Sequence, residues 1–91
     1  MTGYILETSR EADKFFEKNK IEGQRIKKNF AHIAENPFDN IKLYDIKLCK
    51  GSLYGLMRLR TGKYRAIFKI INARLVIYVI KVDSRGDVYK K

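Results

Sequence analysis

The chain has 91 residues, of which 45% are hydrophobic. This size and composition suit a single compact domain, residues 1–91, and argue against global disorder. Twenty Lys and Arg residues against ten Asp and Glu give a formal net charge of +10, which favours a polyanionic partner, with nucleic acid ahead of an anionic membrane or an acidic protein. A highly charged surface that serves only solubility is the alternative.

The lone cysteine and lone histidine exclude an internal disulfide and a cysteine metal cluster, and we expect no metal and no other cofactor. The N-terminal residues contain no apolar signal core, and the apolar run LVIYVI (75–80) is too short to span a bilayer. We therefore expect a cytoplasmic protein that does not enter membranes.

The first half of the chain predicts one short strand followed by two helices. YILE (4–7) is the strand candidate, and Thr8 with Glu11 forms a capping-box pattern that predicts a helix start at Thr8. A second helix is expected over 21–35, where apolar residues recur at helical spacing, and Asn36-Pro37 ends it. Because little sequence separates the two helices, they are expected to form an antiparallel hairpin.

The second half changes to strand patterns, rich in β-branched and aromatic residues and separated by short turn signals. The expected strands are 44–51, 54–62, 63–71 and 73–82. Short connections imply an antiparallel meander, since parallel neighbours need long crossovers. The predicted fold class is α+β, with the helical hairpin packed on one face of a twisted, mainly antiparallel four-stranded sheet.

Alternation along these strands predicts that Arg58 and Arg65 share one exposed face of the sheet. Like charges held close together cost energy unless an anion lies between them, and the planar guanidinium group suits a phosphate. The alternative is a merely solvated sheet face. His32 is expected at the surface of the second helix or the edge of the core, and Cys49 as a small buried hydrophobic residue.

The stretches LMRLRTGKYRAIFKI (56–70) and LVIYVIKVDSRGDVYKK (75–91) resemble the RelE/ParE toxin superfamily, and the RelE branch more closely. The shared pattern is an arginine-bearing strand, a turn, the motif GKYR (62–65), an apolar hairpin, and a terminal arginine followed by a tyrosine. The two helices and the sheet fit as well, so the resemblance extends over nearly the whole chain.

The resemblance implies a toxin of a type II toxin–antitoxin system that enters the ribosomal A site and cuts mRNA there. It assigns Arg65 to the scissile phosphate, Arg85 to the leaving group, Tyr89 to the mRNA base, and Arg58 to phosphate contact or proton transfer. We expect RNA or ribosome binding by the remaining basic side chains, namely Lys47, Lys50, Arg60, Lys63, Lys81 and Lys90.

The resemblance leaves the general base open, because Leu56 stands where some members carry a basic residue. Lys47, Lys50, Lys63 and Lys81 are the candidates. The implied partners are a cognate antitoxin, forming a hetero-oligomer, together with the small ribosomal subunit and mRNA. Two other functions stay open: a ParE-like inhibitor of DNA gyrase without nuclease activity, and a non-enzymatic module that binds RNA or the ribosome.

Overall fold

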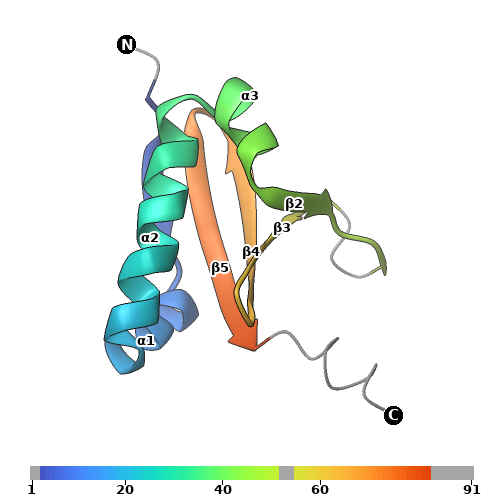
Figure 1. The fold of residues 1–91 in the computed structure, drawn as a ribbon. Coiled ribbons are helices and arrows are strands. Elements are labelled where there is room, and N and C mark those ends of the chain that lie inside the picture. Colours follow the sequence, from blue (N-terminus) through green and yellow to red (C-terminus); the bar gives the residue numbers. More distant parts are fainter. Residues whose placement is uncertain (1–2, 52–54, 83–91) are drawn as a thin grey trace.

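The computed structural model describes residues 3–51 and 55–82. It has two layers, with α1 and α2 together on one side of a twisted sheet (Figure 1). The expected α+β class is therefore confirmed. The elements in chain order are β1 (Ile5–Thr8), α1 (Arg10–Lys18), α2 (Lys20–Glu35), α3 (Pro37–Asn40), the short 3-10 helix η1 (Ile41–Leu43), β2 (Asp45–Leu48), β3 (Met57–Thr61), β4 (Tyr64–Ile71) and β5 (Arg74–Val82).

The sheet has five strands in the order β1-β5-β4-β3-β2. The predicted antiparallel meander is confirmed for β2 to β5, but the predicted count of four strands is wrong. The fifth strand is β1, which confirms the strand candidate at 4–7 and joins the sheet by pairing in parallel with β5, Ile5 lying opposite Arg74. The long stretch of chain between β1 and β5, which includes both helices, makes this parallel pairing sterically feasible.

The start of α1 differs from the predicted capping box. Thr8 is still paired with Ile77 as the last residue of β1, so the chain leaves the strand one residue later. The N-cap is Ser9, whose hydroxyl accepts a hydrogen bond from the backbone N–H of Ala12 at 3.1 Å. Sheet pairing thus displaced the cap by one position, because Thr8 cannot serve both elements.

The two helices form the predicted hairpin, with Asn19 as the C-cap of α1 and the N-cap of α2. Gly23 permits their close approach, since a Cβ atom there would lie 2.9 Å from Cδ1 of Phe16. The prediction that Asn36-Pro37 ends the second helix is confirmed at Glu35. Pro37 then opens the short helix α3, which we did not predict, because proline is well suited to a first helical position.

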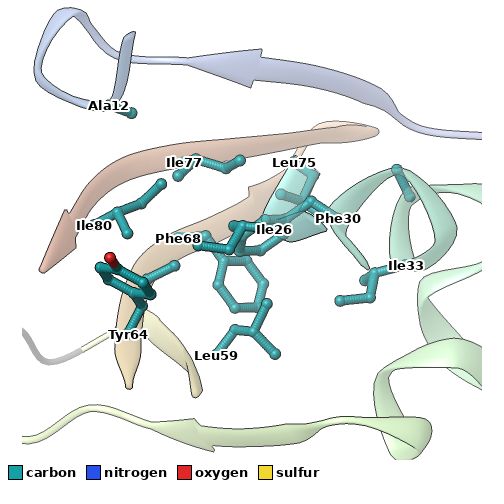
Figure 2. Packing of buried hydrophobic residues seen from close by; sticks show 12 residues of the cluster. Ala12, Ile26, Phe30, Ile33, Leu59, Tyr64, Phe68, Leu75, Ile77 and Ile80 are labelled. Carbon is teal, nitrogen blue, oxygen red and sulfur yellow. The ribbon is translucent and has the colours of Figure 1, made fainter. Parts of the chain in front are cut away.

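The core lies between the helices and one face of the sheet (Figure 2). Phe30 of α2 meets Phe68 of β4 edge-to-face at 5.0 Å between ring centroids, and both side chains are fully buried. Branched aliphatic residues surround them, among them Ile26, Leu59 and Ile77. Because the helices cover only this face, the side chains on the opposite face of the sheet are not part of the core and are available for binding.

A β-bulge in β5 decides which side chains reach that opposite face. Phe68 pairs with Ile77 and Ile67 pairs with Val79, so Tyr78 is the additional residue on β5. Beyond the bulge the alternation is reset: Ile80 points into the core, and Lys81 lies opposite Arg65. Strict alternation from the buried Ile77 would have turned Lys81 toward the helices instead.

Candidate functional site

Basic side chains gather on the face of the sheet that the helices leave uncovered. Residues directly opposite each other in neighbouring strands share a face. The pairings Lys47 with Arg58, Arg60 with Arg65, and Arg65 with Lys81 therefore place five cations from four strands together. Arg58 joins this set because it is two residues from Arg60 on β3. The register confirms the predicted shared face of Arg58 and Arg65; we call this set the basic face.

A cavity of about 350 Å³ opens on the basic face. Its lining residues are Lys47, Leu48, Cys49, Lys50, Arg58, Arg65, Ile67, Val79 and Lys81. Five of these described lining residues are cationic and none is acidic. Ile67 and Val79 come from the two strands β4 and β5 and supply an apolar floor. The site can therefore hold an anionic ligand at its rim while an apolar or aromatic part rests on the floor.

Cys49 does not occupy the buried position that we expected. It is half-buried and forms part of the cavity wall. Its backbone N–H donates to the carbonyl oxygen of Leu56 at 2.9 Å, which ties the end of β2 to the approach to β3. Cys49 is not in the core because it directly follows the edge strand β2, outside the part of the sheet that the helices cover.

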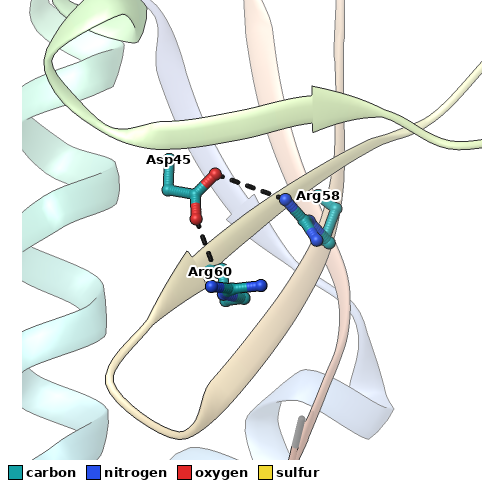
Figure 3. Close-up of polar contacts among 3 residues, drawn as sticks. All are labelled: Asp45, Arg58 and Arg60. Carbon is teal, nitrogen blue, oxygen red and sulfur yellow. Dashed lines mark hydrogen bonds and ion pairs between the residues drawn. The ribbon is translucent and has the colours of Figure 1, made fainter. Parts of the chain in front are cut away.

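Two arginines of the basic face, Arg58 and Arg60, form ion pairs. Arg58 is the more buried of the two, because its side chain is only 12% exposed. Its Nη2 atom lies 3.3 Å from Oδ1 of Asp45, and the other carboxylate oxygen lies 3.5 Å from Nε of Arg60 (Figure 3). Within the described part of the chain, the buried Nε of Arg58 has no hydrogen-bond partner. Asp45 thus bridges two arginines of β3 from the neighbouring strand.

Asp45 is a site residue that the sequence reasoning missed. We expected an external anion between Arg58 and Arg65, but we did not expect the carboxylate of the protein that lies between Arg58 and Arg60. The signal was present but needed the register: Asp45 pairs directly with Arg60 once β2 and β3 are aligned. Sequence alternation alone does not reveal which residue of one strand lies opposite which residue of the next.

Arg65 differs from Arg58 in its surroundings. It is half-buried, lines the cavity, and forms no ion pair with any residue in 3–51 or 55–82. Its cross-strand neighbours are Arg60 and Lys81, both cationic. A guanidinium group placed among cations in this way favours an anionic ligand, because the ligand would relieve the repulsion.

The other predicted residues divide into three groups. Lys47, Lys50 and Lys81 line the cavity, and Arg60 is not a lining residue but pairs across the strands with Arg65, which is. Lys63 lies elsewhere, on the turn between β3 and β4, with its Nζ atom 5.7 Å from the ring centroid of Tyr64. The structure therefore does not bring Lys63 to the cavity. The remaining predictions, Arg85, Tyr89 and Lys90, lie outside the described residues.

His32 takes the expected place at the edge of the core. Its Nδ1 atom lies 2.7 Å from the hydroxyl of Tyr44, a contact that fastens α2 to the segment before β2. Among the residues that the structure describes, no group of three or more His, Cys, Asp or Glu side chains could hold a metal ion. No described helix combines the length and apolar character that a membrane span requires.

Several solved structures with a similar fold are complexes of a toxin with its antitoxin. An archaeal RelE–RelB complex from Pyrococcus horikoshii includes a chain with a TM-score of 0.72 and 23% identity, the match covering 93% of this chain and 99% of that one. The RelBE2 toxin–antitoxin complex from Mycobacterium tuberculosis gives 0.68 and 20%, covering 90% and 93%. The YoeB–YefM complex from Staphylococcus aureus gives 0.64 and 20%, covering 86% and 94%.

No sequence among the curated proteins matches this chain. A family model does match, and its description is the ParE toxin of the type II toxin–antitoxin system parDE. The match spans residues 6–89, from the first strand to the C-terminal segment. The chain therefore belongs to the ParE toxin family of type II toxin–antitoxin systems, within the RelE/ParE superfamily.

Proposed function

We propose that this toxin is a ribosome-dependent endoribonuclease that cuts mRNA in the A site and so stops translation. The observation that carries the proposal is the cavity on the basic face, with five cations, no carboxylate among its described lining residues, and an apolar floor. Such a cavity suits a phosphodiester with an adjoining base, whose π-face tolerates apolar surroundings. RNA also supplies its own nucleophile, so the site needs positioning, charge stabilisation and proton transfer, and no metal.

In the proposed reaction the 2′-oxygen attacks the adjacent phosphorus, and the bond from phosphorus to the 5′-oxygen breaks. The 2′-hydroxyl loses a proton, the leaving 5′-oxygen gains one, and a cyclic phosphate remains. Arg65 stabilises the charge that develops on the phosphate, and Arg58 contacts the same group or the next one. Lys47, Lys50 and Lys81 line the cavity and remain the candidates for the general base. Lys63 is a weaker candidate, because it lies outside the cavity.

Two roles rest on the resemblance alone. Arg85 is assigned to the leaving group and Tyr89 to the mRNA base, and both lie outside the described residues. The same resemblance supplies the partners that we propose: a cognate antitoxin that assembles with the toxin as a hetero-oligomer, and the small subunit of a cytoplasmic ribosome. The structural neighbours solved as toxin–antitoxin complexes support the first of these partners.

The second candidate function is inhibition of DNA gyrase without nuclease activity. The specific observation in its favour is that the matching family model is that of the ParE toxins. A gyrase inhibitor binds a protein target, and a cavity suited to a phosphodiester would have no evident part in that action. A non-enzymatic module that binds RNA or the ribosome is the third candidate, and it differs from the first only in lacking cleavage.

Induced expression followed by mapping of mRNA ends separates these functions. The first proposal predicts cuts inside translated codons, and Arg65→Ala should reduce cutting by about 10²- to 10³-fold, the usual effect of removing one group that stabilises a developing charge. Arg74→Ala is the matched control: Arg74 begins β5, is paired with Glu7 and lies away from the cavity. It should leave the cutting rate unchanged.

The other outcomes are equally informative. Intact mRNA together with a DNA-damage response would identify gyrase as the target. Intact mRNA with ribosomes occupied by the protein would favour the binding module. If expression of the wild-type protein leaves growth unaffected, both toxin mechanisms are wrong.

A further inference from the structure

Asp45 is the only acidic residue in strands β2 to β5. It stands beside the cavity, on the edge strand, and each of its carboxylate oxygens faces a different arginine of β3 (Figure 3). One oxygen faces Arg58 and the other faces Arg60. A phosphodiester offers two non-bridging oxygens, which can occupy the same two positions.

The contacts of Asp45 are weak for charged partners. Their lengths of 3.3 and 3.5 Å exceed the 2.7–2.9 Å that is typical of strong charge-assisted hydrogen bonds. The Asp45 side chain is 44% exposed, so water competes for the carboxylate, and its ion pair with the 35% exposed Arg60 contributes little. An anion that binds the two arginines more tightly can therefore replace the carboxylate, and little free energy is lost with the Asp45 contacts.

Arg58 has an unused hydrogen-bonding group that such an exchange could satisfy. Its side chain is largely buried, and its Nε atom lacks a hydrogen-bond partner among the described residues. A buried donor without a partner is costly. Asp45 offsets the charge of Arg58 but does not reach its Nε–H group, so the guanidinium group keeps one donor without an acceptor among the described residues.

From these contacts we propose that Arg58 and Arg60 form a phosphate subsite next to the cavity, which Asp45 fills in the free protein. On binding, a backbone phosphate of RNA replaces the carboxylate, and the guanidinium group of Arg58 turns from Asp45 toward the phosphate. The identity of the ligand as RNA rests on the proposed function; the anion exchange itself does not. The subsite adds a second phosphate contact beside the one at Arg65.

In this proposal Asp45 competes with the ligand for the two arginines. Removing the charge of Asp45 should therefore increase the affinity for phosphate. Asp45→Asn keeps the size of the side chain and removes its charge. Inorganic phosphate and a short 2′-O-methyl oligoribonucleotide, which cannot be cleaved by 2′-hydroxyl attack, should then bind about two- to fivefold more tightly, as expected from the loss of a competing, partly exposed carboxylate. Titration calorimetry measures the affinities, and the NMR signal of the Arg58 Nε–H group should shift as phosphate is added.

Glu17→Gln is the matched control, because it changes the net charge by the same amount from an exposed position on α1. A gain for Asp45→Asn that exceeds the gain for Glu17→Gln supports the subsite. Asp45→Glu retains the competing charge and should show no gain. Equal effects of Asp45→Asn and Glu17→Gln, or weaker binding by Asp45→Asn, would overturn the proposal.

Failure of this inference is distinguishable from failure of the proposed function. Phosphate affinity can be measured whether or not the wild-type protein cuts mRNA. Wild-type protein that cuts nothing, combined with tighter phosphate binding by Asp45→Asn, would reject the nuclease and keep the subsite. Cutting of mRNA by the wild-type protein, without tighter binding by Asp45→Asn, would do the reverse.

Discussion

Phe68 and Phe30 show how single residues determine the stability of this small domain. The two rings meet edge-to-face at 5.0 Å and are fully buried where α2 crosses the sheet. Phe68→Ala would leave a cavity that the sheet cannot close, and should lower the free energy of unfolding by about 3–5 kcal/mol. Chemical denaturation followed by circular dichroism measures this loss.

Phe38→Ala is the control for that prediction, because Phe38 is 80% exposed on α3. Its removal should change the free energy of unfolding by no more than about 0.5 kcal/mol. Similar losses for both variants would mean that the core is not organised around Phe68.

Arg58 and Arg65 also differ at the scale of single residues, although they share a face of the sheet. Arg58 is paired with a carboxylate, whereas the cross-strand neighbours of Arg65 are both cations.

The β4–β5 hairpin is the element in which backbone conformation conflicts with residue type. Asn72 and Ala73 both have positive φ, 51° and 61°, as a type I′ turn requires. Alanine is strained there, so Ala73→Gly should raise the free energy of unfolding by about 0.5–1 kcal/mol, after the greater freedom of glycine in the unfolded chain is subtracted. Thermal and chemical denaturation both test this gain.

The same substitution elsewhere should have the opposite sign. Ala31 is exposed within α2, and Ala31→Gly should lower the free energy of unfolding by about 1 kcal/mol through lost helix propensity. If Ala73→Gly is also destabilising, the turn does not hold Ala73 in the left-handed region.

The bulge at Tyr78 is the second special feature of this hairpin, since it turns Lys81 to the basic face.

The net charge of +10 acts at the scale of the whole molecule. If the five cations that line the cavity all contact phosphates of single-stranded RNA, log K should fall with log salt at a slope of about −3.5. Raising NaCl from about 50 to about 200 mM would then weaken binding roughly a hundredfold. Fluorescence anisotropy with a non-cleavable oligoribonucleotide gives the slope.

Lys81→Gln should make that slope shallower by about 0.7, whereas Lys63→Gln should leave it nearly unchanged, because Lys63 lies outside the cavity. Equal changes for the two variants would show that binding follows the overall charge and is independent of the cavity. This pair of variants therefore separates a local site from a generally basic surface.

The sequence alone determined the class of fold and most of its elements. Helical spacing, the Asn36-Pro37 stop and the short turns between apolar strands are local signals, and each produced an element where it was expected. Alternation also placed Arg58 and Arg65 on one face, because that relation depends only on the pleat of adjacent strands and their short turn. The basic composition favours a polyanionic partner, and this stays a prediction.

The order of the strands in the sheet and the neighbours of each site residue were decided only by the tertiary structure. These features depend on which distant segments pair and in which register. The parallel pairing of β1 with β5 joins opposite ends of the described chain, and it moved the helix cap from Thr8 to Ser9. The β2–β3 register placed Asp45 between Arg58 and Arg60, a contact that the sequence alone did not indicate. The bulge in β5 interrupted the alternation and so brought Lys81 beside Arg65, since one additional residue reverses the face of every side chain beyond it.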